Sequence, residues 1–136
     1  MNLAIRLGLA VLLVAATASP SPSAQTARTK QVMHTKLDHS QRILEAVVTA
    51  NWPLLERESG EIAMIVRDPG WSALAIPGYM RYTEAFLRAT DDLNEAARLR
   101  DLESASLGLV SLTTSCVNCH RYLARARIVT SHPGGR

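Results

Sequence analysis

Two residue types that bind metals and form covalent bonds with cofactors stand together near the end of the chain. The stretch SCVNCHRY contains both cysteines of the chain, Cys116 and Cys119, and His120 follows directly. In a helix, Cys116 and His120 are four residues apart and lie one above the other, with Cys119 about 60° round the axis from Cys116. Two thiols and an imidazole are therefore expected on one side of one helix, facing the core.

Four kinds of chemistry use such a cluster. The pattern Cys-x-x-Cys-His is the attachment signal of a c-type haem, whose iron is bound by the histidine. A redox dithiol usually opens a helix after a strand, and no strand is expected before this pair. A closed zinc site needs four ligands, and His34, His39 and His132 show no second ligand pair at zinc spacing. A disulfide across three residues closes a small loop and stabilises little. The pattern favours haem.

Four amphipathic segments must position this cluster. Apolar residues recur at helical spacing in each of them, and no run of alternating β-branched residues competes. The connections between them are short, which is typical of neighbouring antiparallel helices. The sequence therefore predicts an all-α protein, an antiparallel four-helix bundle with covalently attached haem, with helices over residues 31–50, 51–66, 79–100 and 102–127.

Helix boundaries have their own signals. Asn51 and Asp101 are suited to cap the second and fourth helices, and Pro53 is tolerated in a first helical turn. Residues 68–78 contain two Pro-Gly turn signals and are expected to form a loop. The polar residues before position 31, which include Arg28 and Lys30, are expected to form a flexible leader.

The N-terminus has the features of a secretory signal peptide. One early basic residue, Arg6, precedes an apolar run of residues 7–18, and small residues and prolines follow. The run is shorter than the roughly 20 residues that span a bilayer. Cleavage is expected after Ala24, with Ala18 as the alternative site. The sequence thus predicts a signal peptide over residues 1–24 and one exported domain over residues 25–136, located in a bacterial periplasm without a membrane span after cleavage.

Charge excludes one class of partner. The mature part carries a formal charge of only about +2, spread along the chain without a basic stripe or interleaved aromatic residues. Nucleic acid is therefore not an expected partner. Arg121, Arg125 and Arg127 lie near the end of the predicted fourth helix. Such basic residues either interact favourably with the helix dipole, pair with the propionates of a haem or face an acidic redox partner.

The mature chain resembles the class II c-type cytochromes, the cytochrome c′ group. The resemblance runs from MHTKLDHSQRILEAVV in the first predicted helix to SCVNCHRYLARAR in the last, and the position of the motif in the last helix is its most specific part. It implies one haem c attached to Cys116 and Cys119, with His120 as the proximal iron ligand. It also implies a redox partner protein of unknown identity and a possible homodimer through the first two helices.

The resemblance further implies that the first helix supplies the group on the other side of the iron. Met33 lies in the middle of the predicted apolar stripe of that helix, so it is the expected distal ligand. His34 lies at the edge of the stripe, and His39 is expected to face water. An electron carrier without enzymatic activity is therefore predicted. The alternative is a haem protein with an open or displaceable distal site that binds NO or CO. The predicted stripe consists of Met33, Leu37, Leu44, Val47 and Val48.

Overall fold

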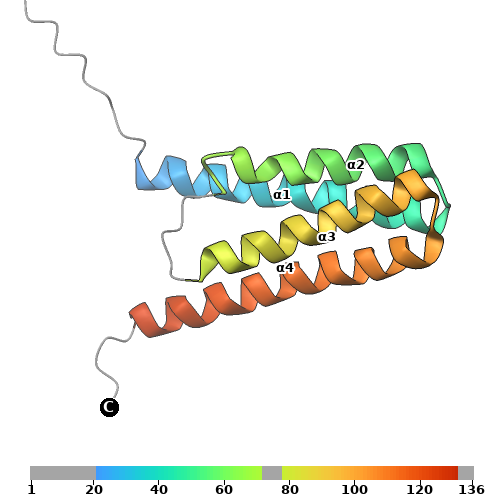
Figure 1. The fold of residues 1–136 in the computed structure, drawn as a ribbon. Coiled ribbons are helices and arrows are strands. Elements are labelled where there is room, and N and C mark those ends of the chain that lie inside the picture. Colours follow the sequence, from blue (N-terminus) through green and yellow to red (C-terminus); the bar gives the residue numbers. More distant parts are fainter. Residues whose placement is uncertain (1–20, 72–77, 132–136) are drawn as a thin grey trace, which may run out of the picture.

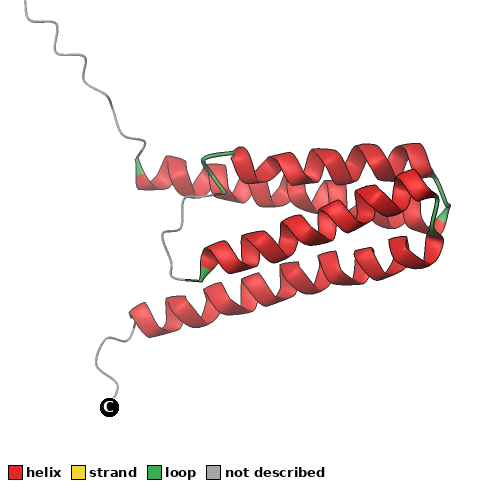
Figure 2. Cartoon of the chain, viewed as in Figure 1, coloured by secondary structure: helices red, strands yellow, loops and turns green. Residues whose placement is uncertain are grey.

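Four helices form the described part of the chain (Figures 1 and 2). The structure is a computed structural model that describes residues 21–71 and 78–131, with side chains described as far as residue 126. Each helix packs antiparallel to the next, which confirms the predicted all-α four-helix architecture. Residues 1–20, which contain most of the predicted signal peptide, lie outside the described residues. The helices are α1 (Pro22–Val48), α2 (Trp52–Met64), α3 (Tyr79–Leu99) and α4 (Leu102–Ser131), and a short 3-10 helix, η1 (Ile65–Arg67), follows α2.

The helix starts follow local capping chemistry. Asn51 Oδ1 accepts a hydrogen bond from the backbone N–H of Leu54 at 3.2 Å, and Asp101 Oδ1 accepts one from Ser104 at 3.1 Å. Both predicted caps are confirmed, because a side-chain oxygen satisfies an N–H that has no partner within the helix. Gly78 precedes α3 with φ of 85°, a left-handed conformation that glycine adopts without strain.

The first helix begins earlier than the sequence predicted. The prediction of a flexible leader was wrong: Ser21 caps a helix that starts at Pro22, so Ala24 lies in its first turn. Arg28 Nε donates to Asp68 Oδ1 at 2.8 Å, and Thr29 Oγ1 donates to the carbonyl of Gly70 at 3.0 Å. These contacts hold the start of α1 against the turn that follows η1. A pattern within one helix gives no sign of such partners.

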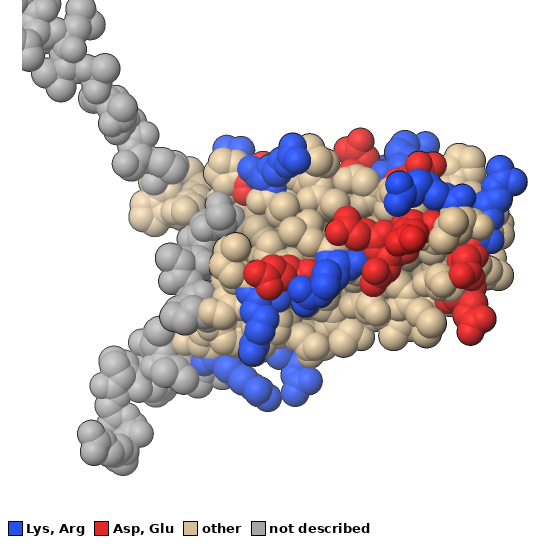
Figure 3. All heavy atoms as spheres, viewed as in Figure 1, with Lys and Arg blue, Asp and Glu red and all other residues tan. Residues whose placement is uncertain are grey.

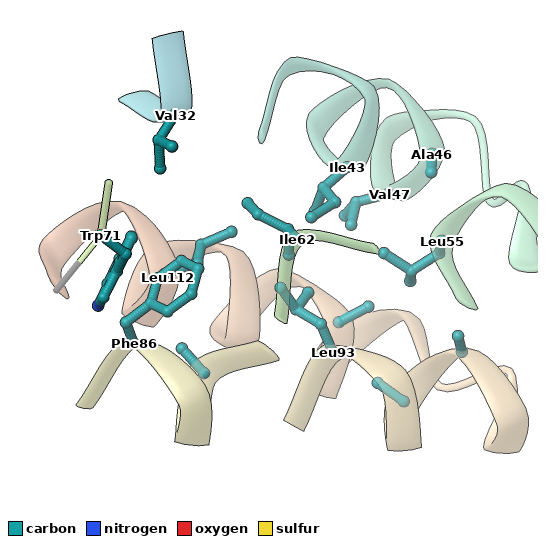
Figure 4. Packing of buried hydrophobic residues seen from close by; sticks show 14 of the residues in the cluster. Val32, Ile43, Ala46, Val47, Leu55, Ile62, Trp71, Phe86, Leu93 and Leu112 are labelled. Atoms are coloured by element: carbon teal, nitrogen blue, oxygen red, sulfur yellow. The ribbon is translucent and has the colours of Figure 1, made fainter. Parts of the chain in front are cut away.

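The core runs along the bundle axis (Figure 4). Large side chains fill its centre, and alanines let the helices approach closely where they meet. Trp71 and Phe86 cover one end of this core with their ring centroids 5.1 Å apart. The half of α4 that carries Cys116, Cys119 and His120 lies at the same end. The fully buried apolar side chains of largest volume are Ile43, Leu55, Ile62, Phe86, Leu93 and Leu112.

The buried face of α1 differs from the predicted stripe. Leu37, Leu44 and Val48 are 53%, 50% and 75% exposed, so most of the predicted stripe is not core. At about 100° per residue, the centre of the observed face lies roughly 80° round from Met33. Met33 therefore lies at the edge of the buried face and not in its middle. The side chains buried in α1 are Val32, Lys36, Ile43, Ala46 and Val47.

The buried face of α4 is also rotated relative to the prediction. Leu102, at the start of the helix, is 49% exposed. Cys119 follows the line of the buried residues, whereas Cys116 and His120 lie on its flank, and His120 is exposed. The expectation that all three groups face the core was therefore correct for Cys119 and wrong for His120. The buried residues of the fourth helix are Ala105, Gly108, Leu112 and Ser115.

The α1 and α4 helices meet less closely than consecutive helices do. They contact each other far more sparsely than α1 contacts α2 or α3 contacts α4. The exposed apolar edge of α1 and the flank of α4 that carries His120 border this seam. The seam is therefore where the bundle has room for a ligand.

Charged side chains of both signs are interspersed over the face shown in Figure 3. Within α4 no acidic residue follows Glu103, so its C-terminal half carries only basic charges. Among the helices of residues 21–131, none combines the length and apolarity needed to cross a bilayer.

Candidate functional site

A pocket of about 300 Å³ lies where the N-terminal half of α1 faces the C-terminal half of α4. The two helices supply opposite walls, and residues before and at the start of α3 form the end. Most of the lining surface is apolar, so the pocket is suited to a ligand with a large apolar surface. The lining residues are Thr29, Met33 and Lys36 of α1, Trp71 and Tyr79, and Cys119, His120, Leu123 and Ala124 of α4.

The predicted cluster of α4 borders this pocket. Cys119 and His120 line it directly, and Cys116 lies one helical turn earlier on the same flank as His120. Both thiols are free and half-buried. Two reactive sulfurs and an imidazole are therefore presented along one side of one helix, at the border of an apolar pocket.

Burial changes the acid–base properties of Cys119. Burial raises the pKa of its thiol above the ordinary value, and the positive charge of Lys36 offsets only part of this increase. The thiol is therefore mostly protonated at neutral pH. This is the opposite of the lowered thiol pKa that characterises catalytic dithiols. The environment of Cys119 thus argues against the redox-dithiol interpretation.

His120 is kept in its neutral form. One side of the ring is exposed, but burial of the side that lines the pocket lowers the imidazole pKa below its ordinary value. The positive charge of Lys36 lowers this pKa further. A neutral imidazole has a free lone pair, which is the form that binds a metal.

Opposite the α4 cluster, α1 presents Met33 to the pocket. Met33 is half-buried and packs against the edge of the core. The structure therefore brings Met33 to the same pocket as His120, as the sequence interpretation requires. His34, the other candidate of this helix, is exposed and is not part of the pocket lining.

His39 was predicted to face water, and this prediction was wrong. Its Nδ1 lies 2.7 Å from Oε2 of Glu58, a carboxylate that is almost completely buried. The partner belongs to α2, so the pattern of α1 alone could not reveal this contact. His39 thus joins α1 to α2 and is not part of the pocket.

Lys36 is the pocket residue that sequence reasoning missed. Its side chain is only 6% exposed, and Nζ lies 4.9 Å from the ring centroid of Trp71 and 4.6 Å from that of Phe86. Attraction between a cation and an aromatic face stabilises such a charge within about 6 Å of the ring. No pattern within α1 indicates this burial, because the aromatic partners belong to other segments.

Two aromatic residues close the end of the pocket. Trp71 Nε1 donates a hydrogen bond to Thr83 Oγ1 at 3.1 Å, and the Tyr79 hydroxyl donates to the carbonyl oxygen of Trp71. Burial, together with the nearby Cys119, raises the pKa of Tyr79 to about 12. Both side chains are therefore fixed, neutral walls of the pocket.

The basic residues beside the pocket are solvated. Arg121 and Arg125 are exposed, and no ion pair holds either of them within the described residues. Tyr122, between them, turns inward and packs on Tyr82 with ring centroids 5.0 Å apart. The side chain of Arg127 lies outside the described residues. Among the described residues, no acidic side chain pairs with Arg121 or Arg125.

The described residues contain no group of three or more His, Cys, Asp or Glu side chains arranged to hold a metal ion on their own. Cys116, Cys119 and His120 therefore do not form such a metal site by themselves. No match was found for the chain among protein-family models, curated protein sequences or solved structures.

Proposed function

We propose that this chain is an exported, monohaem c-type cytochrome of class II that carries single electrons. One observation supports this proposal above the others: a single apolar pocket is lined by Cys119 and His120 from α4 and by Met33 from α1. The motif in α4 and the expected ligand of α1 are 87 residues apart in sequence, so their meeting is not a consequence of local pattern.

The residues present fit a haem. Cys116 and Cys119 would hold it by adding their thiols to its two vinyl groups, and a protonated, half-buried Cys119 is inert to most competing reactions. His120 would bind the iron through its neutral ring on one side, and Met33 would bind it on the other. When bound, haem supplies an iron that alternates between Fe²⁺ and Fe³⁺.

The protein contributes orientation and exclusion of water. His120 is held on the rigid helix that also carries both thiols, so the attachment points and the ligand keep a fixed relation to one another. Trp71 and Tyr79, fixed by hydrogen bonds, close the pocket. A thioether from Met33 is a neutral, soft ligand, and it favours a higher reduction potential than a second histidine would. The basic end of α4 would then receive an acidic redox partner.

An absorption spectrum of the exported protein tests the proposal. The oxidised and reduced forms are measured after acid–acetone extraction, which removes any haem that is not covalently attached. We expect a haem chromophore that remains with the protein, and a weak near-red band of methionine-to-iron ligation. Met33→Ala should abolish that band, and Met64→Ala, which changes an exposed methionine of α2 outside the pocket, should not.

Loss of the chromophore on extraction would contradict haem attachment. A double variant, Cys116→Ala with Cys119→Ala, gives the reference for a protein without thioether bonds. If the parent protein behaves like this variant, the two cysteines serve another role.

A second function is favoured by the position of Met33. Met33 lies at the edge of the buried face of α1, next to the exposed Leu37, so packing does not enclose it on all sides. A methionine held in this way is easily displaced, and a displaceable ligand would let the iron bind NO or CO. A high-spin spectrum that shifts on addition of carbon monoxide to the parent protein would support this function in place of electron transfer.

A further inference from the structure

Lys36 is a buried cation that points into the pocket. It comes from the same helix as Met33 and lies three residues later, closer to the core. Its ammonium group lies over both the Trp71 and the Phe86 ring, 4.9 Å and 4.6 Å from the two centroids, and its charge acts on both Cys119 and His120 of the opposite wall. The proposed function assigns no role to this charge.

Among the described residues, no carboxylate side chain forms an ion pair with Lys36. All twelve acidic side chains of the chain belong to the ranges that the structure describes. Glu58 and Asp68 form all of the ion pairs found there, with basic residues other than Lys36. The two rings provide attraction but no negative charge. A buried charge is costly unless a group of opposite sign accompanies it, so the pocket is suited to an anionic occupant.

We propose that Lys36 makes this pocket a binding site for a small inorganic anion of two or three atoms, such as azide or nitrite. The inference rests on the proposed function, because the anion would bind beside the iron and compete with Met33. The propionates of haem are a less suitable source of negative charge. Lys36 acts on Cys119, where a vinyl-bearing ring of haem would be attached, and the propionates belong to the two opposite rings.

The first test measures anion affinity with the haem in place. In ferric protein that carries Met33→Ala, azide is titrated at fixed pH and ionic strength and followed by absorption. Adding Lys36→Met, which retains a long apolar side chain against the two rings, should weaken azide binding by about tenfold to a hundredfold, since a hydrogen bond to a charged group is lost. Adding Lys30→Met, which removes an exposed lysine of the same helix, should leave the azide affinity within about twofold.

A neutral ligand separates charge from shape. Imidazole is titrated into the same ferric variants, and its affinity should be the same with and without Lys36→Met. Lys36→Arg should retain most of the azide affinity because it retains the charge. Equal azide affinity with and without Lys36→Met would overturn the proposal. So would an equal loss of azide and imidazole affinity, because it would show that Lys36 only shapes the pocket.

A second test needs no haem. Azide that binds only the folded protein raises its thermal unfolding midpoint. At constant ionic strength, this rise should occur in Met33→Ala and in Met33→Ala with Lys30→Met, but not in Met33→Ala with Lys36→Met. If the protein carries no haem, the proposed function fails, and this comparison alone decides the anion site. If haem is present and azide binding does not depend on Lys36, the anion site fails while the cytochrome function stands.

Discussion

The substitution Glu58→Gln tests how a buried charge joins α1 to α2. Glu58 is 1% exposed, and its two carboxylate oxygens face different partners. His39 Nδ1 lies 2.7 Å from Oε2, and the guanidinium of Arg57 donates to Oε1 at 2.9 Å. Arg42 lies farther away, at 3.8 Å. Glutamine keeps the volume and removes the negative charge.

The expected loss at neutral pH is about 2 kcal/mol of unfolding free energy. A hydrogen bond to a charged group contributes roughly 1.5–3 kcal/mol. The bond with His39 is screened from water, but Arg57 is 63% exposed, so its pairing contributes at most about 1 kcal/mol. Glutamine can still form one weaker hydrogen bond in the same place. For a domain of this size, about 2 kcal/mol corresponds to a decrease in Tm of roughly 8 °C.

The effect depends on pH in a defined direction. Burial alone would raise the pKa of Glu58, but the hydrogen bonds from His39 and Arg57 outweigh it and lower the pKa below its ordinary value of 4.5. A carboxyl group with a lowered pKa in the folded state stabilises the protein above the unfolded pKa. That stabilisation is lost as the pH falls through the folded pKa. The difference between Glu58→Gln and the parent should therefore shrink as the pH falls below 4.5.

Urea unfolding followed by circular dichroism measures this difference. Both proteins are unfolded at neutral pH and at several acidic values, and Glu61→Gln, at an exposed position of the same helix, is the control. The control should differ from its parent by less than about 0.5 kcal/mol throughout. The reasoning is refuted if Glu58→Gln is as stable as the parent at neutral pH, or if a loss found there persists unchanged in acid.

Two glycine substitutions should have opposite effects on Tm. Gly60→Ala should raise Tm, because the added Cβ meets nothing within 4 Å and alanine favours a helix. The expected gain in unfolding free energy is about 0.5–1 kcal/mol. Gly78→Ala should lower Tm, because φ is +85° and the new Cβ would lie 3.1 Å from the hydroxyl of Tyr122. The expected loss of unfolding free energy is about 1–2 kcal/mol. Thermal unfolding of both variants decides, and the same sign for both would contradict this account.

Local signals predicted the fold well. The caps at Asn51 and Asp101 and the turn that follows η1 depend on neighbours within three or four residues, and their chemistry is visible in the sequence. Residues 72–77 of the predicted loop lie outside the described residues. The start of α1 was missed because it depends on Asp68 and Gly70, about 40 residues away. Contacts of that kind have no signature within the helix that they extend.

The same distinction explains what was predicted of the site. The relation of Cys116, Cys119 and His120 to one another is fixed by the geometry of one helix, so the sequence alone established it. The geometry of one helix does not determine which face of α1 is buried. Lys36 and His39 looked like surface residues until their partners on other segments were known, and their burial moved the core face away from Met33. An argument from periodicity assigns charged side chains to the exposed face of a helix. Aromatic rings or a buried carboxylate on another segment can instead hold such a side chain in the core.

The difference between the α4 wall, which the sequence predicted, and the α1 wall, which it did not, bears on which function the pocket serves. The α4 wall, with thiols and a neutral imidazole, is compatible with electron transfer and with ligand binding alike. The α1 wall would distinguish them, because Met33 would close the proposed iron, whereas Lys36 would attract an anion to the same space. Met33 lies at the edge of its helix face and Lys36 lies deeper, so the charge is held more firmly than the thioether. If Met33 binds the iron tightly, azide should reach it only in Met33→Ala. If Met33 binds weakly, azide should displace it in the parent, and that displacement should require Lys36.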